Sequence, residues 1–535
     1  MKYDAIIIGS GAGGLSCALT LAKEGKKVLV LEQHYVAGGW CHSFKLKGHR
    51  YTPGIHYIGL LGEGESTSEL YKGLGIANDL EFYKMNEKAY EHCHIGEERF
   101  DIPAGFDAFN EAMRERFPHD KKNITKYLKM VRTVSTQLQL IPKINGFWDL
   151  ITIPWRTRYL GKYGLFSLKA ISNWFVKDDL AKIILNIQAG DHGLPPAKAS
   201  FPLHAAVMEH YFAGGYYPKG GGESIVNAML KAIEKHEGDV WTSSAVKQIL
   251  LEDIVGDDAK GKKAVGVQLK DGEKIYADII VSNADPQKTY DTLVGRENLG
   301  AKLVEKLDAT TYSCSSLMLF VTINADARAL GLDSGNIWVV PNKDMDEVYE
   351  EMMGTDLLEK EYFDGMFISC TTLKDPSSFD GKNHVLEIIT YINYDAFDEF
   401  KDEDKKRSDK YKEFKKALEA KMIKSLEKAV PGIEKSIIHT NLATPITNDF
   451  YINTTRGNVY GTAKNLQQIG PNAFKPKSEI EGLYLCGASI LSHGVAGASF
   501  SGVTTAGVIL GKRQDELLVH DNSQNIKIYD AEASV

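Results

Sequence analysis

The first chemistry that this sequence suggests is the binding of a dinucleotide through a glycine-rich turn near the N-terminus. The turn is Gly9-Ser10-Gly11-Ala12-Gly13-Gly14, between the short apolar run 5–8 and an apolar helical run. Glycines here permit a tight turn, let the backbone approach a pyrophosphate, and let the helix pack on the strand. Glu32 follows the next apolar run, 28–31, where a carboxylate accepts hydrogen bonds from a ribose hydroxyl. The pattern favours a nucleotide site over an ordinary strand–helix turn.

A second glycine pair indicates which dinucleotide binds. Gly38-Gly39 follows Glu32 closely and precedes Trp40. This resembles the continuation in FAD-binding proteins of the glutathione-reductase and amine-oxidase type, where the pair passes near the cofactor's phosphates. No second GxGxxG motif is followed by an acid at ribose distance, so a dedicated NAD(P)H domain is not expected. We therefore predict FAD as the cofactor, reduced by transiently bound NAD(P)H or by another protein.

Further parts of the same site are expected far along the chain. Val246 falls where such folds hold adenine through backbone groups, and Asn283 follows the apolar run 275–281. The glycine-rich stretch 487–502 opens a helix whose positive N-terminus is expected to face the flavin's N1–C2=O edge. The expected cofactor-binding residues are Gly9, Ser10, Gly11, Ala12, Gly13, Gly14, Glu32, Gln33, Gly38, Gly39, Trp40, Val246, Asn283, Gly487, Ala488, Gly497 and Ala498.

His56 is the candidate catalytic residue. It lies in the glycine-bounded aromatic stretch 54–59. Two interpretations have equal weight: a histidine that lines the flavin-side cavity and delivers a proton, and a structural histidine bonded to backbone groups. Tyr57 and His493 are alternative proton donors, whereas His42 is interpreted as structural.

The elements that must position these residues predict an α/β fold with two parts. One is a Rossmann-like FAD-binding domain of the glutathione-reductase or amine-oxidase type, and the other is an inserted α+β substrate domain. The first is expected in three pieces and the second in two: 1–65, 215–295 and 470–512 for FAD, 66–214 and 296–469 for the substrate. Residues 513–535 are interpreted as a polar tail.

Composition limits the functional classes. The chain has 535 residues, 43% hydrophobic and 25% charged, which fits a folded protein with more than one substructure. A net charge of −8 offers no general attraction for nucleic acid. The six cysteines show no CxxC spacing, so neither a redox disulfide nor a metal site is expected. No apolar run reaches about eighteen residues, and the first strand begins close to Met1, which predicts a cytoplasmic enzyme.

The segment 136–176 differs from the rest of the chain. Aromatic and basic residues interleave in it, as in Trp155-Arg156-Thr157-Arg158-Tyr159, although the protein as a whole is acidic. Two interpretations stand side by side: peripheral contact with the inner face of a membrane, and a helical lid over the substrate cavity. Both predict a hydrophobic small-molecule substrate. Nothing in the sequence indicates the oligomeric state.

Several of these stretches resemble the phytoene-desaturase and carotenoid-isomerase group of flavoproteins, over nearly the whole chain. The stretches 31–39, 217–221 and 281–285 are shared across that group, and 54–59 and 456–462 resemble its retinol saturase (all-trans-retinol 13,14-reductase) branch most. The resemblance implies FAD, a hydrophobic tunnel for a polyene and peripheral membrane attachment. Vertebrate-type saturases carry an N-terminal secretory segment that is absent here, which favours an enzyme on the cytosolic face.

The resemblance also implies a reaction. A flavin-dependent oxidoreductase of this kind would saturate one carbon–carbon double bond of a retinoid- or carotenoid-like polyene, with hydride from reduced FAD and a proton from the protein or solvent. The same FAD site would suit a carotenoid desaturase or a cis–trans isomerase. A non-catalytic, FAD-containing lipid-binding protein is the alternative from another class. An amine oxidase is disfavoured, because no paired-aromatic cage for an amine is evident in the sequence.

Overall fold

A five-stranded parallel sheet begins the fold, in a computed structural model that describes residues 3–141, 147–254, 261–402, 405, 408–520 and 523–533. The strand order is β19-β13-β1-β2-β9. The strands are β1 (Ala5–Ile8), β2 (Val28–Leu31), β9 (Asp239–Trp241), β13 (Ile279–Ser282) and β19 (Leu483–Leu485). All three pieces of the expected FAD-binding domain therefore meet in one sheet.

Alternate residues of these strands pack into two separate cores. Ile7 and Val30 face a core with helices α1 (Ala12–Lys23), α10 (Gly222–Lys235) and α16 (Gly494–Leu510). Ile6 and Leu29 face the antiparallel sheet of β10 (Val246–Asp253), β11 (Lys262–Leu269) and β12 (Lys274–Tyr276). Because both faces of the sheet are covered, the strands consist of continuous apolar residues rather than alternating apolar and polar residues.

A seven-stranded mixed sheet forms the second part, in the order β18-β14-β17-β16-β15-β6-β7. Its strands are β6 (Glu91–Ile95), β7 (Glu98–Ile102), β14 (Ser315–Ile323), β15 (Asn336–Val340), β16 (Met366–Cys370), β17 (His384–Ile392) and β18 (Ile437–Ala443). On β17, Leu386 and Ile388 pack in the core under α14 (Asp409–Ala429), whereas Ile389 and Tyr391 pack in the core with α4 (Lys121–Leu138) and α9 (Phe201–Tyr211). The strand period of two places Glu387 on the same face as Ile389 and Tyr391.

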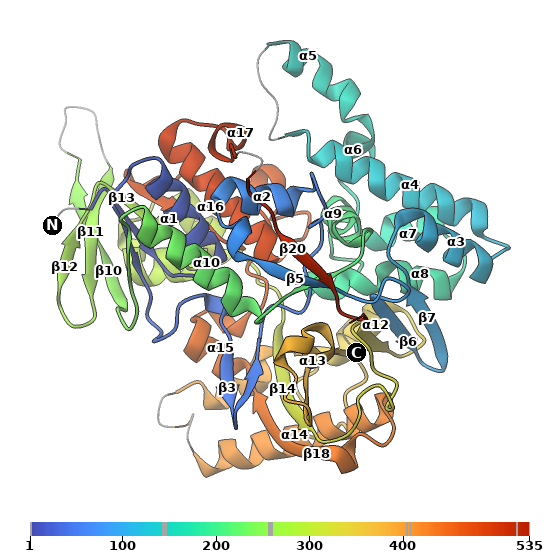
Figure 1. The fold of residues 1–535 in the computed structure, drawn as a ribbon. Helices are drawn as coiled ribbons and strands as arrows, with labels where there is room; N and C mark the ends of the chain where they lie inside the picture. The colour runs from blue at the N-terminus through green and yellow to red at the C-terminus, as the bar shows by residue number, and fades with distance from the viewer. Residues whose placement is uncertain are drawn as a thin grey trace.

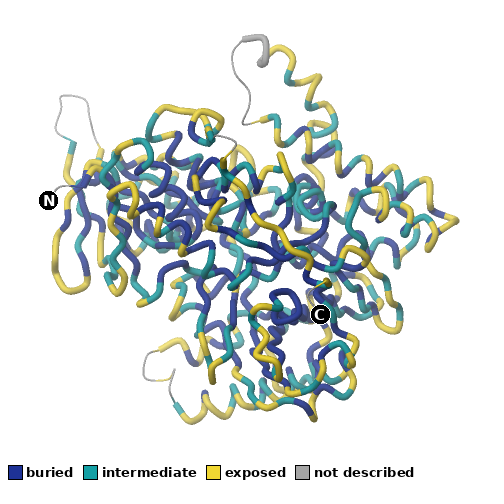
Figure 2. The backbone as a smooth tube through the Cα atoms, in the orientation of Figure 1, coloured by how far each residue is buried: buried dark blue, intermediate teal, exposed yellow. Residues whose placement is uncertain are grey.

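Helices cover both sheets. Those not yet named are α2 (Ser66–Leu74), α3 (Phe106–Arg116), α5 (Phe147–Arg156), α6 (Arg158–Tyr163), α7 (Leu168–Phe175), α8 (Asp179–Asn186), α11 (Ala301–Asp308), α12 (Met345–Met352), α13 (Thr371–Lys374), α15 (Pro445–Ile452) and α17 (Gln514–Leu517). Helix α5 projects from the body of the molecule (Figure 1), and Figure 2 shows its residues 151–156 as mostly exposed. No helix in the described ranges is both long and apolar enough to cross a bilayer.

One expected domain boundary differs from the structure. Leu70, Tyr71 and Phe82 pack in the same core as α1 and β1, so residues 66–82 accompany the parallel sheet rather than the substrate domain. The cause is a long-range pairing, because β5 (Glu81–Lys84) pairs with β8 (Tyr216–Pro218) at the edge of that core. The hairpin of β3 (Phe44–Leu46) and β4 (His49–Tyr51) then leads from the first part to the second.

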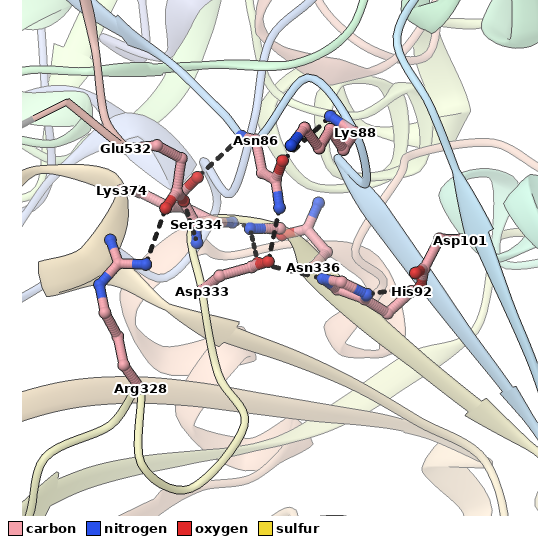
Figure 3. A network of polar contacts seen from close by, with 11 residues as sticks. Asn86, Lys88, His92, Asp101, Arg328, Asp333, Ser334, Asn336, Lys374 and Glu532 are labelled. Carbon is pink, nitrogen blue, oxygen red and sulfur yellow. Dashed lines mark hydrogen bonds and ion pairs between the residues drawn. The ribbon is translucent and has the colours of Figure 1, made fainter. Parts of the chain in front are cut away.

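The segment expected as a polar tail is exposed but structured in its described part. Its strand β20 (Lys527–Asp530) pairs in parallel with β5. Beyond β20, the Glu532 carboxylate accepts hydrogen bonds from the Arg328 guanidinium at 2.7 Å and from the Ser334 backbone N–H at 3.0 Å (Figure 3). These contacts tie the C-terminal segment to the loop that precedes β15.

Candidate active site

One cavity of about 330 Å³ extends from the β1–α1 turn to the face of the second sheet. Most of the expected cofactor-binding residues line it: Gly9, Gly11, Ala12, Gly13, Glu32, Gln33, Gly38, Gly39, Trp40, Val246, Asn283, Gly487, Ala488 and Ala498. Ser10, Gly14 and Gly497 are not among its lining residues. His56 lines the same cavity on the side of the second sheet. The folded chain thus gathers residues that are widely separated in sequence around one space.

The glycines converge where a side chain could not fit. A Cβ on Gly13 would lie 2.7 Å from Asn283 Oδ1 and 2.7 Å from Gly487 Cα, and one on Gly11 would lie 2.7 Å from Asn283 Nδ2. Gly39, at φ +55°, approaches the Gly11 backbone in the same way, with a Cβ-to-Cα distance of 3.2 Å. These close approaches bring the backbones of the glycine turns against one another and against the side chain of Asn283, which also lines the cavity.

Helix α1 begins at this junction and suits a phosphate. Its N-cap is Gly11, which has no side chain to cap the helix, and no acidic residue lies in its first turn. The first N–H groups of the helix therefore have no capping side chain, and the helix dipole favours an anion there. Together with the glycine cradle, this arrangement fits the pyrophosphate of a dinucleotide such as FAD.

Glu32 has an internal role in addition to lining the cavity. One carboxylate oxygen accepts hydrogen bonds from the Ser10 backbone N–H at 3.0 Å and the Ser10 hydroxyl at 2.6 Å. The other accepts from the His34 N–H at 2.8 Å, and the Ser10 hydroxyl accepts from the Gly38 N–H at 2.9 Å. Ser10, expected to contact the cofactor, joins the two glycine turns directly, because its hydroxyl accepts from the Gly38 N–H while donating to Glu32. Glu32 Oε2 already accepts two hydrogen bonds, whereas Oε1 accepts one and retains acceptor capacity for a ribose hydroxyl.

Gly14 and Gly497 serve helix packing. A Cβ on Gly14 would lie 2.1 Å from the Gly9 backbone oxygen, so only glycine lets α1 sit this close to β1. A Cβ on Gly497 would lie 2.8 Å from the Ser492 Cβ, inside the turn that opens α16. The glycine motif predicts the packing role of Gly14, whereas the contact between Gly497 and Ser492 is evident only in the folded structure.

His56 faces a buried carboxylate on β17. Its Nδ1 lies 3.2 Å from Glu387 Oε2, and the two side chains are 14% and 1% exposed. The Thr52 backbone N–H donates to the other oxygen of Glu387, and the edge of the Phe367 ring packs on the imidazole at 5.3 Å between ring centroids. The pair therefore combines an imidazole that reaches the cavity with a carboxylate that can orient it.

The remaining wall on this side is apolar and aromatic. Met318, Ile389, Tyr391 and Tyr460 line the cavity, and the hydroxyl groups of the two tyrosines lie 3.0 Å apart. The Tyr391 hydroxyl also donates to the Gly190 backbone oxygen at 2.7 Å. A smaller, apolar pocket beyond Ile389 and Tyr391 shares both residues with the main cavity. An elongated apolar molecule fits this wall.

A group of buried ionisable side chains lies behind His56. The Tyr57 hydroxyl donates to Asp191 at 2.7 Å, and the Lys374 ammonium donates to the His56 backbone oxygen at 2.7 Å and to Asn336. Burial raises the pKa of Asp191 to about 7 and that of Glu91 to about 8. Burial also lowers the pKa of Lys374 to about 7, against the opposing charges of Glu91 and Glu387. Several proton-holding groups thus lie close to the histidine.

The alternative proton donors are placed less favourably than His56. Tyr57 is buried behind the wall and stacks on Tyr211, with ring centroids 4.0 Å apart. His493 forms the N-cap of α16, where burial lowers its pKa to about 3. Neither residue lines the cavity. His42, interpreted as structural, bonds through Nδ1 to the Gly39 backbone oxygen at 2.6 Å.

Sequence reasoning did not identify Glu387, Asp191 or Lys374. Glu387 had a detectable signal, because it is the single charged residue within the apolar strand run 385–392. A lone carboxylate in a doubly buried strand requires a partner. Asp191 lies in a short 3-10 helix and Lys374 at the end of α13, where no periodic pattern marks them.

Comparisons with known proteins agree with this geometry. The family described as flavin containing amine oxidoreductase matches residues 12–309. An all-trans-retinol 13,14-reductase from Danio rerio is 30% identical over 95% of this chain and 86% of its own length. A chloroplastic prolycopene isomerase from Daucus carota is 25% identical over 94% and 79%. A solved putrescine oxidase shares the fold with a TM-score of 0.63, at 13% identity over 96% of this chain and 100% of its own. The predicted FAD-binding fold and the predicted family resemblance are confirmed.

Proposed function

The chain belongs to the family of flavin-containing amine oxidoreductases, which implies FAD as its cofactor, and we propose that it saturates one carbon–carbon double bond of a lipophilic polyene. The single observation that carries this proposal is the continuous cavity, because it joins a dinucleotide cradle to an apolar wall that holds one imidazole. The similarity to an all-trans-retinol 13,14-reductase supports a polyene as the substrate class.

The FAD-binding residues follow from the cradle. The N-terminus of α1 and the glycines of the first turn would hold the pyrophosphate, Glu32 the ribose, and the Val246 backbone the adenine. Gly487, Ala488 and the first turn of α16 would lie along the flavin. When bound and reduced, FAD supplies the hydride that one alkene carbon requires.

The protein's own part is to orient the polyene, exclude water and deliver a proton. Saturation adds one hydride and one proton across the double bond, so the neighbouring carbon needs an acid. His56 is the proposed acid because it lines the cavity and its Nδ1 faces Glu387. Glu387 orients the ring, and solvent replaces the proton after each turnover.

A second candidate function uses the same site. The similarity to a prolycopene isomerase supports cis–trans isomerisation of a carotenoid, in which the substrate is neither oxidised nor reduced overall. Desaturation of a carotenoid precursor is the reverse chemistry and needs an electron acceptor instead of a donor. The reductant in the first case is transiently bound NAD(P)H or another protein.

One experiment separates these candidates. Purified protein with bound FAD is incubated without oxygen with retinol, lycopene isomers or phytoene, with dithionite, with a quinone as electron acceptor or with neither, and the product masses are measured by mass spectrometry. A product heavier by two hydrogens that requires the reductant supports the reductase. An isomer of unchanged mass selects the isomerase, and a product lighter by two hydrogens selects the desaturase. Unaltered polyenes under every condition would leave the non-catalytic lipid-binding alternative.

We also propose that the exposed part of 136–176 contacts a membrane surface. Trp155 and Leu165 are 75% and 82% exposed, and the Arg158 guanidinium lies 5.4 Å from the Trp155 ring. Exposed aromatic and basic side chains of this kind suit the headgroup layer of a bilayer. Residues 142–146 lie outside the described residues. The lid alternative lacks support, because the described cavity-lining residues come from other segments.

A further inference from the structure

Lys464 is a buried lysine directly behind the wall of the cavity, and burial lowers the pKa of its ammonium to about 7. Its Nζ donates a hydrogen bond to the Ala488 backbone oxygen at 2.7 Å, and Ala488 lines the cavity. The residue is 4% exposed. Its other polar neighbour is the Thr462 hydroxyl, at 3.4 Å. Both neighbours are neutral.

The charge of Lys464 has no counter-ion within the described residues. No carboxylate of those residues lies within ion-pair distance of Nζ, and the nearby ionisable side chains are His192 and His493. Burial is the largest cause that lowers the pKa values of both histidines, and the charge of Lys464 lowers them further. Both ring nitrogens of His192 lack a hydrogen-bond partner. A buried ammonium without a counter-ion is costly, so a negative charge beside Lys464 would stabilise its protonated form.

The backbone holds Lys464 firmly in this position. Gly461, at φ +76°, packs so closely on Ser489 that a Cβ would lie 2.6 Å from its hydroxyl oxygen. The Thr462 N–H donates to the same Ser489 hydroxyl at 3.1 Å. On the other side, the Ser200 N–H donates to the Lys464 backbone oxygen at 3.2 Å. The ammonium is thus clamped between the loop that precedes α16 and the start of α9.

The first turn of α16 adds positive potential at the same end of the cavity. Gly494 and Val495 line the cavity, and the N-cap His493 offers no side-chain hydrogen bond to the helix. The dipole of this helix and the charge of Lys464 therefore act together on whatever lies against Ala488. Two-electron reduction of a flavin with uptake of one proton leaves one negative charge on its ring system.

We propose that Lys464 is the electrostatic partner of the negative charge that bound FAD gains on reduction, and that it raises the redox potential of the cofactor. This role rests on the FAD site proposed above but not on the identity of the polyene. The Ala488 peptide separates Lys464 from the cavity. Lys464 therefore acts through its electrostatic field and is not a catalytic residue. In a site without bulk water, such a charge acts strongly over short distances.

The test compares midpoint potentials of FAD-loaded protein, measured without oxygen by reductive titration against a reference dye at about pH 6, where a lysine with a pKa of about 7 is protonated. Lys464→Met removes the charge and is expected to shift the potential to more negative values. Lys464→Arg keeps the charge and should restore a potential close to that of the wild type. Thr462→Val removes a neutral neighbour while keeping the charge, so its potential should stay near that of the wild type.

Clear results would overturn the proposal. A Lys464→Met protein with full FAD content and an unchanged potential contradicts it, and so does an equal shift in Thr462→Val. If Lys464→Met is insoluble, Lys464→Gln removes the same charge and is measured in its place. Wild-type protein that shows the expected shifts but saturates no polyene refutes the proposed reaction alone, because the potential is measured without substrate. Wild-type protein that binds no FAD refutes both.

Discussion

His56 Nδ1 lies 3.2 Å from Glu387 Oε2, so a residue of the loop after β4 and a residue of β17 form one pair at the cavity wall. Removing the imidazole with His56→Gln should lower the rate of polyene saturation on the order of 10²-fold, the usual contribution of a general acid. Rates are measured with excess reductant, so that proton delivery rather than flavin reduction is tested. FAD content, measured by absorbance, should be unchanged.

Glu387→Gln tests the second member of the pair. The amide oxygen can still accept the Thr52 N–H, so the fold of the loop should survive. Loss of the negative charge should lower the rate less than His56→Gln does, because the imidazole remains present but is less well oriented. If the double variant is no slower than His56→Gln alone, the two residues act as a unit. A normal rate in His56→Gln would exclude the histidine as the acid.

The glycine cradle predicts a loss of cofactor on a one-carbon change. Gly13→Ala places a Cβ 2.7 Å from both Asn283 Oδ1 and Gly487 Cα, so the segments around the cofactor must separate. We expect FAD content per protein to fall severely. Gly161→Ala is the matched control, because Gly161 lies in α6 and a Cβ added to it would meet no neighbouring atom within 4 Å. Equal FAD content in the two variants would contradict the cradle.

The parallel sheet and its cofactor loops were predictable because their signals are local. The turn at Gly9–Gly14 and the glycines after β2 and β19 each lie beside a short apolar strand, so type and spacing are visible in one stretch. The strand partners could then be inferred from the expected fold. Ser10 shows the limit of this reasoning, because its orientation toward Glu32 depends on how two turns meet in space.

The acid–base side of the site was only half predictable. His56 stood out by its flanking glycines, whereas its partner Glu387 comes from a distant strand in another core. Pairing between β14 and β17 fixes which face of β17 turns toward the cavity, and that register depends on the whole second sheet. Residues 66–82 pack with the first part rather than the second for a similar reason, since the pairing of β5 with β8 is long-range.

Glu91 should make the stability of the protein depend on pH. Burial raises its pKa from 4.5 to about 8, so the folded state holds a proton that the unfolded state releases. This contribution is fully present below pH 4.5 and is lost as pH rises through about 8. Glu91→Gln cannot ionise, so its melting temperature relative to the wild type should be higher at about pH 9 than at about pH 5. Thermal melts at the two pH values measure the difference, and the exposed Glu63→Gln serves as the control.

The exposed side chains near α5 and α6 predict binding to lipid vesicles. Trp155→Ala together with Leu165→Ala removes two large apolar side chains that contact water in the free protein. If they enter the headgroup layer, the partition constant for vesicles, measured by sedimentation, should fall on the order of tenfold. Tyr276→Ala on β12 is the matched control, since Tyr276 is 51% exposed and lies on the other part of the molecule. Because Arg158 lies beside Trp155 and Lys162 beside Trp174, binding should also weaken with salt when the vesicles contain anionic lipid. Equal loss in the control and the double variant would mean that general surface hydrophobicity, rather than this segment, causes binding.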